Sequence, residues 1–126
     1  MRYLKKILMI AVPAVLLNVW LLRFNLATSY RGGNSTNMLE EFAVYGLNDT
    51  TAYLVGGLKI LASIGLLLGF FFDKTIKPAA SVIVVLMIGA LAMHLKVADD
   101  AIKFLPAGLI FLFSLVILLL QLKIIK

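Results

Sequence analysis

Lys59 is the residue of this sequence whose chemistry first needs an explanation. It lies within residues 54–72, a run that is otherwise apolar enough to cross a bilayer. An ionisable side chain inside a spanning segment is costly, and it usually faces other helices or a polar cavity. The nearby positions at helical spacing are the small residues Gly56, Ala62 and Ser63, and small residues let membrane helices approach one another closely. This pattern predicts that Lys59 points towards neighbouring helices rather than lipid.

Other polar side chains are expected in the same layer as the Lys59 ammonium. His94 ends the third apolar run, Asn18 and Arg23 lie near the end of the first, and two acids belong to the loop above them. The predicted polar cluster therefore consists of Asn18, Arg23, Glu40, Glu41, Lys59 and His94. Within it, Lys59 and His94 could donate hydrogen bonds to an anionic or carbonyl-bearing ligand such as a quinone headgroup.

A purely structural role is the alternative for this cluster. Lys59 could reach outward to pair with Glu40, Glu41 or Asp49 and so hold the loop on the bundle. Such a pair adds little stability when it is hydrated, whereas a buried ammonium without its partner is costly. His94 could equally be an ordinary helix-interface residue. Because the chain has no second histidine and no cysteine, no metal site is expected.

The composition is that of a membrane protein. The 126 residues are 63% hydrophobic and 14% charged, with a mean hydropathy of +1.07, whereas soluble domains are about half apolar and about a quarter charged. The absence of cysteine excludes thiol chemistry, and no phosphate-binding loop or nucleophile elbow identifies a catalytic residue. The net charge of +6 comes from basic residues at the ends of apolar runs, which indicates membrane topology rather than nucleic-acid binding.

Four apolar runs are long enough for helices that cross the hydrocarbon core, which takes about 20 residues. The predicted spans are residues 7–23, 52–72, 78–95 and 105–122. Short connections make the last three spans antiparallel neighbours, so we expect an all-α, integral membrane four-helix bundle that forms one domain over residues 1–126. Pro78 and Pro106 suit the first turns of the third and fourth helices, and Pro13 is expected to kink the first.

The distribution of lysine and arginine predicts that both termini are cytoplasmic. The expected inner side has the larger set, Arg2, Lys5, Lys6, Lys74, Lys77, Lys123 and Lys126. The expected outer side has Arg23, Arg31, Lys96 and Lys103. Trp20, Tyr30 and Tyr53 are expected in the aromatic belt at the outer interface.

A cleaved signal peptide is an alternative interpretation of the first span. A basic start precedes the apolar run, and the small residues at 27–29 resemble a cleavage region. Asn18 and Arg23 interrupt the run and argue against this alternative.

Residues 24–51 form the long outer loop, and a short amphipathic helix is predicted within it. Asn37 can cap the start of this helix, with Glu40 three residues later as in a capping box, and Gly46 can end it. The apolar face of the helix consists of Met38, Leu39, Phe42 and Tyr45. We expect the helix to lie at the outer interface or to cap the bundle.

Gly65 and Gly69 form a GxxxG pattern in the second span, which favours close helix packing. The sequence leaves open whether they pack within the bundle or against a second copy. The expected partners are thus the lipid bilayer and either another membrane protein or a second copy of the chain through Gly65 and Gly69, with no nucleic acid.

Three stretches resemble the DoxX-like family of small four-helix membrane proteins. They are "EEFAVYGLNDTTAYLVGGLKILASIGLLLGFF", "KPAASVIVVLMIGALAMHLKVAD" and "FLPAGLIFLFSLVILL". The resemblance implies an accessory or quinone-proximal subunit of a membrane redox system, located in a bacterial inner membrane, with no cofactor in this chain other than a bound quinone. Family members commonly have a glutamate where Lys59 stands, so acid chemistry is not expected there.

The same resemblance implies an alternative function. A vertebrate relative resembles an assembly chaperone for ligand-gated channels, so the chain could be a non-enzymatic membrane scaffold or assembly chaperone for a partner membrane protein. Partner binding should then depend on Phe42 and Tyr45 rather than on Lys59.

Overall fold

The computed structural model describes residues 2–125, and over this range the chain is all-α. Its α-helices are α1 (Arg2–Leu17), α2 (Met38–Val44), α3 (Asp49–Leu68), α4 (Ile76–Lys96) and α5 (Leu105–Gln121). α1 continues through Pro13 and passes directly into a π-helical turn, η1 (Asn18–Leu22). Two members of the predicted cytoplasmic set lie outside the described residues, namely Lys126 and the side chain of Arg2.

The four long helical segments of the described chain are each long and apolar enough to cross a membrane. They are Tyr3–Leu22, Asp49–Leu68, Asp73–Lys96 and Ala101–Gln121. Four long apolar helices are therefore confirmed, whereas their crossing of a membrane remains a prediction. All four segments begin a few residues earlier than predicted, and the largest difference at a C-terminal end is in the second. That span was expected to continue to Phe72, but α3 ends at Leu68 and the next residues form a turn. The hydrophobicity of residues 69–72 predicts contact with the membrane, but it does not determine where the helix ends.

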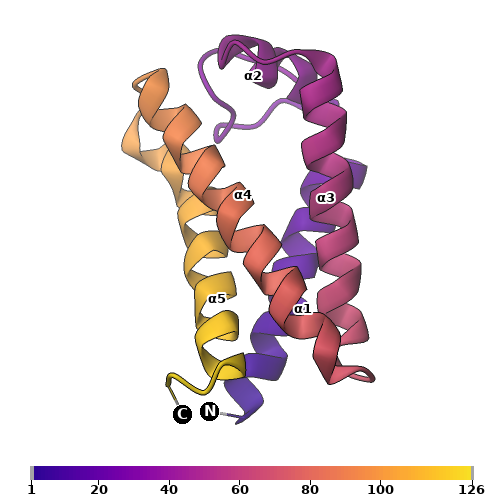
Figure 1. Cartoon of the computed structure of the whole chain (residues 1–126). Coiled ribbons are helices and arrows are strands. Elements are labelled where there is room, and N and C mark those ends of the chain that lie inside the picture. The colour runs from indigo at the N-terminus through magenta and orange to yellow at the C-terminus, as the bar shows by residue number, and fades with distance from the viewer. Residues whose placement is uncertain (1, 126) are drawn as a thin grey trace.

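The long helices pack in a ring in the order α1, α3, α4, α5. Both chain ends lie at one end of this ring, and α2 with the loop around it lies across the other end (Figure 1). We call these the terminal end and the lid end, and we call residues 24–48 the lid. Which side of the membrane each end faces remains a prediction from the charge distribution.

Within the described part of the chain, two clusters of buried apolar side chains hold the ring together. The larger one, towards the terminal end, contains Leu8, Met9, Val12, Leu16, Ala62, Leu66, Ile76, Ala79, Ala80, Ile83, Met87, Ile110 and Ile117. The smaller one, at the lid end, contains Trp20, Met38, Phe42 and Ala52. Because its members come from η1, α2 and α3, the smaller cluster holds the lid helix on the bundle.

Gly65 and Gly69 make their close contacts within the bundle. A Cβ atom on Gly65 would lie 3.0 Å from the Cβ of Ala79, and one on Gly69 would lie 2.5 Å from Cγ1 of Ile76. The two glycines therefore bring α3 against the start of α4, where a short turn joins these helices. Association of two copies through the same glycines remains a prediction.

The lid helix α2 forms where the sequence predicts it. The Asn37 side chain accepts a hydrogen bond from the Glu40 amide at 2.8 Å and caps the helix. The Glu40 carboxylate accepts hydrogen bonds from the hydroxyl and amide of Thr36 at 2.7 and 2.8 Å, and these bonds lower its pKa. Gly46 follows the helix in a left-handed conformation with φ 84°, which ends it as expected.

Gly56 of α3 provides a direct test of the packing at the lid end. A Cβ atom there would lie 2.5 Å from Cε3 of the buried Trp20 ring. We expect Gly56→Ala to lower the free energy of unfolding by about 1–3 kcal/mol, because the ring must move. Gly57→Ala is the matched control, since its Cβ atom would meet nothing within 4 Å. Thermal unfolding in one detergent measures both variants, and equal midpoints would contradict this packing.

Candidate functional site

A cavity of about 660 Å³ lies at the lid end, between the two apolar clusters. Its wall includes Leu16, Met87 and Ile110 of the larger cluster and Trp20 and Phe42 of the smaller one. Most of the wall is apolar, with a few polar groups near the lid. This size and character are typical of small-molecule sites, which measure about 300–1,000 Å³.

The structure brings most of the predicted polar cluster together around this cavity. The predicted residues that line it are Asn18, Arg23, Glu41, Lys59 and His94. Glu40 is instead exposed and bonded to Thr36, so it lies apart from the others. The role of the predicted cluster in ligand binding remains a prediction. Among residues 2–125, no three histidine or carboxylate side chains come together as a metal site would require.

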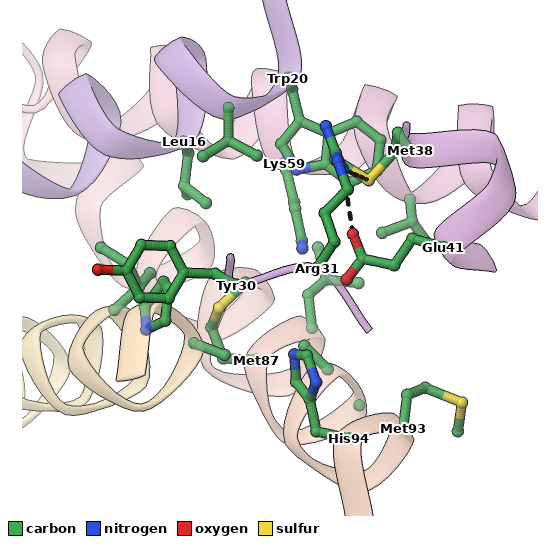
Figure 2. A pocket seen from close by; sticks show the side chains of 18 of the residues that line it. Leu16, Trp20, Tyr30, Arg31, Met38, Glu41, Lys59, Met87, Met93 and His94 are labelled. Carbon is green, nitrogen blue, oxygen red and sulfur yellow. Dashed lines mark hydrogen bonds and ion pairs between the residues drawn. The ribbon is translucent and has the colours of Figure 1, made fainter. Parts of the chain in front are cut away.

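The ammonium of Lys59 faces the cavity (Figure 2). The residue is 8% exposed, and its Nζ lies 5.1 Å from the centroid of the Trp20 ring. Within the described chain, Lys59 donates no hydrogen bond from its side chain and forms no ion pair. The pairing with Glu40, Glu41 or Asp49 that the structural alternative requires is therefore not formed among these residues.

This arrangement leaves the Lys59 charge only partly stabilised. A cation–π contact contributes about 1–2 kcal/mol, whereas burial of an ammonium costs several kcal/mol. The ammonium carries three N–H donors, and the cavity is the space into which they can point. A ligand or water molecules in the cavity would provide the missing acceptors.

The buried guanidinium of Arg31 organises the lid above this space. Its Nε donates to the carbonyl of Leu26 at 2.8 Å, and one terminal nitrogen donates to the carbonyls of Arg23 and Phe24. The other terminal nitrogen lies 3.1 Å from Oε1 of Glu41. Arg31 therefore ties the chain that follows the first helical segment to α2.

The second oxygen of Glu41 is occupied as well. It accepts hydrogen bonds from the amide of Gly32 at 3.0 Å and from the hydroxyl of Tyr45 at 2.7 Å. Burial and the nearby negative charge of Glu41 raise the pKa of Tyr45, so its hydroxyl stays protonated and donates. Because Arg31, Gly32 and Tyr45 occupy this carboxylate, it does not bond to Lys59.

His94 reaches the cavity as part of a buried pair with Asp99. The His94 Nδ1 lies 2.7 Å from Oδ2 of Asp99, and the other carboxylate oxygen accepts a hydrogen bond from the Gly33 amide at 2.9 Å. A carboxylate partner favours the imidazole tautomer with its proton on Nδ1. The Nε2 atom is then the ring nitrogen left for a ligand, an acceptor when the ring is neutral and a donor when it is protonated.

Asp99 remains ionised in this setting. Burial opposes ionisation, but hydrogen bonds from His94 and Gly33, together with the positive charges of His94 and Lys103, outweigh it and lower the pKa of Asp99 below 3.8. A carboxylate with a lowered pKa contributes stability at every pH above its unfolded value. This contribution is therefore present at neutral pH and is lost only as the pH falls below about 3.8.

The end of α4 explains why Asp99 returns to His94. Ala98 has a left-handed backbone with φ 55°, the Asp99 amide bonds to the His94 carbonyl at 3.0 Å, and the Ala98 amide bonds to the Leu95 carbonyl at 3.1 Å. This is a Schellman ending, and it folds the chain back so that residues five apart meet. The sequence analysis missed Asp99 because this ending has alanine where glycine is the usual signal.

The connection from α4 to α5 also anchors the lid. Asp99 accepts from the Gly33 amide, and the Lys103 ammonium donates to the Gly33 carbonyl. The Lys96 ammonium donates to the carbonyl of Tyr45 at 2.8 Å. Because α2 itself packs on α3, these bonds hold the lid to both sides of the cavity.

Trp20 corrects one expectation about the outer interface. It was expected in the aromatic belt, but it is 6% exposed and packs on Phe42 and beside Lys59. The physical reason is Gly56, whose missing side chain leaves room for the indole against α3. Tyr30 is 40% exposed and Tyr53 is 59% exposed, as residues of such a belt would be.

Four candidate spans, a packed lid and a lined cavity define a small multi-pass membrane protein. The family model described as the DoxX-like family matches residues 14–118. The chain therefore belongs to the DoxX-like family, and the resemblance seen in the sequence is confirmed. No curated protein and no solved structure matches the chain.

Lys59→Met tests whether the ammonium is held at a cost to stability. We expect the ligand-free variant to unfold with a free energy higher by about 1 kcal/mol or more, because an apolar side chain of similar length needs no desolvation. Thermal unfolding in detergent measures this difference. Lys77→Met is the matched control, since Lys77 is exposed at the terminal end. A variant less stable than the wild type would show that the ammonium has a stabilising partner.

Asp99→Ala tests the anchor between the lid and the α4–α5 connection. Removal of the carboxylate frees the Gly33 amide, so we expect hydrogen exchange at this amide to accelerate about tenfold, as for a lost bond to a charged group. Mass spectrometry of a peptide that contains residues 31–36 measures the exchange. Asp100→Ala is the control, because this neighbouring acid is exposed. Equal exchange in the two variants would contradict the anchoring role of Asp99.

Proposed function

We propose that this protein binds the headgroup of a membrane quinone in its cavity and acts as an accessory subunit of a membrane redox system. The observation that carries the proposal is the buried Lys59 ammonium, which faces an apolar-walled cavity without a hydrogen-bond acceptor from the described chain. A quinone ring is flat and apolar but carries carbonyl oxygens, which accept hydrogen bonds. Such a headgroup would pack against the apolar walls and accept a hydrogen bond from the ammonium.

The positions of Lys59 and His94 suit the two sides of such a ring. They come from different helices, α3 and α4, and their side chains face the same space (Figure 2). Lys59 can donate to one carbonyl of the quinone. The Nε2 atom of His94 can donate to the other carbonyl when the ring is protonated, or accept from a hydroxyl of the reduced form when it is neutral.

The proposal assigns binding to this chain and electron transfer to a partner subunit. The sequence offers no cysteine for an iron–sulfur cluster or a redox-active thiol pair. The chain would then hold the quinone near the redox centre of its partner. We also infer that the terminal end is cytoplasmic, as its lysines suggest, so that the cavity lies in the outer leaflet of a bacterial inner membrane.

In the scaffold alternative, Phe42 and Tyr45 were expected to contact the partner protein, but both side chains are buried. Phe42 is 8% exposed and Tyr45 is 5% exposed, because both side chains of the lid face the bundle. A partner protein could reach these two side chains only if the lid opened. Its contacts on the closed form would have to come from exposed residues of α2 such as Val44, which is 41% exposed.

The single tryptophan of the chain, Trp20, lines the cavity and provides a local signal for quinone binding. We expect a short-chain ubiquinone analogue to quench its fluorescence saturably in the purified protein. Lys59→Met and His94→Ala should each weaken the apparent affinity about tenfold or more, since each removes a hydrogen-bonding group from the site. Lys77→Met should bind as the wild type does. Quenching that never saturates, or that is the same in all variants, would refute quinone binding in this cavity.

A further inference from the structure

We infer that the cavity prefers a ligand with an anionic oxygen on an apolar body to a neutral ligand of the same shape. The inference rests on the proposed function in one respect, namely that the cavity binds a ligand at all. It goes beyond that function because it does not require the ligand to be a quinone. Two sources share this chemistry, a fatty-acid carboxylate and the ionised oxygen of a hydroxylated quinone.

The charges around the cavity do not balance. The basic residues that line it are Arg23, Arg31, Lys59 and Lys103, and the acidic residue among the lining residues is Glu41. Arg31 is paired with Glu41 at 3.1 Å, and Lys103 lies 3.9 Å from Asp99. Within the described structure, this leaves Arg23 and Lys59 without a paired acid. The cavity therefore carries an excess of positive charge.

The two unpaired basic residues differ in their exposure to water. Arg23 is exposed at the rim, where water can hydrate its guanidinium. Lys59 is 92% buried, since its exposed fraction is 8%, and its ammonium points into an apolar-walled space. Charges interact more strongly where the local dielectric constant is low. An anionic oxygen beside Lys59 would therefore gain more than one beside Arg23, and more than a neutral carbonyl at the same place.

His94 of α4, with its partner Asp99 just beyond the end of that helix, adds a second polar group to the cavity. The Oδ2 atom of Asp99 lies 2.7 Å from Nδ1 of the imidazole, so Nε2 is the ring nitrogen left for a ligand. A protonated ring donates from Nε2 to an anionic oxygen in the cavity. His94 would then add a donor from α4 to the one that Lys59 provides from α3.

The rest of the cavity suits an apolar body. The aliphatic residues of its wall include Val15, Val19, Val55, Val85, Leu86 and Ile110. These side chains provide no hydrogen bonds for a second polar group. The expected ligand is thus an amphiphile whose charged oxygen meets Lys59 and whose remainder is hydrocarbon or an aromatic ring.

Two matched pairs of probes test the preference for charge. Dodecanoate is compared with dodecanol, and 2-hydroxy-1,4-naphthoquinone, which is ionised at neutral pH, is compared with 1,4-naphthoquinone. Affinities are measured by calorimetry on the purified full chain in a nonionic detergent at pH 7.5. We expect the anionic member of at least one pair to bind at least tenfold more tightly than its neutral partner.

Variants at position 59 show whether this preference comes from the ammonium. Lys59→Met should abolish the preference while it retains affinity for dodecanol, which shows that the cavity is intact. Lys59→Arg should keep the preference, and so should the exposed control Lys77→Met. If Lys59→Met fails to fold, Lys59→Gln provides the same comparison with a polar, uncharged side chain. A preference that survives the loss of the charge would overturn the inference.

The outcomes separate this inference from the proposed function. A preference in the dodecanoate pair assigns a lipid-derived carboxylate, and one in the naphthoquinone pair assigns an ionised quinone. If naphthoquinones bind but neither pair shows a preference, the inference fails and quinone binding stands. If neither naphthoquinone binds but dodecanoate is preferred to dodecanol, quinone binding fails and the inference stands.

Discussion

The architecture of the lid end depends on the guanidinium of Arg31. It satisfies backbone carbonyls at the point where the chain leaves its first helical segment, and it holds Glu41 of α2 by an ion pair. Near a bilayer these carbonyls need partners from the protein, because few water molecules are available to them. One side chain thus holds two parts of the lid together over the cavity. The lid covers Lys59, while Glu41 is held by Arg31, Gly32 and Tyr45 and forms no ion pair with its ammonium.

The two ends of the bundle are held together by different interactions. At the terminal end, apolar side chains and close glycine contacts fill the space between the helices, with Ile76 packed against Gly69. At the lid end, hydrogen bonds and ion pairs surround a space that is not filled. Such a division is expected of a binding protein, since a site that holds an unpaired charge gives up stability. The filled end provides the rigidity that keeps α3 and α4 at a fixed separation around the cavity.

Sequence patterns predicted the helices well and the site in part. Apolar runs, caps and small-residue spacing located the spans, the lid helix and the inward direction of Lys59, because each depends on contacts near in sequence. Arg31 and Asp99 were missed as site residues. Arg31 lies in an irregular loop without periodicity. Asp99 meets His94 only because α4 ends in a Schellman motif, and this motif has alanine at the position where glycine would have made it recognisable in the sequence. Glu41 pairs with Arg31 rather than with Lys59 because of where these side chains lie in the fold. The charges in the sequence alone do not reveal this pairing.

The short turn between α3 and α4 has a consequence for how the chain enters the membrane. A lysine in a spanning helix opposes insertion, by about 3 kcal/mol at the bilayer centre and less towards the interface. The α3 segment has a mean hydropathy of 1.8, against 2.1 for the segment that contains α4. Because the turn is short and glycine contacts hold its arms together, the two helices can partition into the bilayer as one hairpin. The more apolar arm would then offset part of the cost of the lysine.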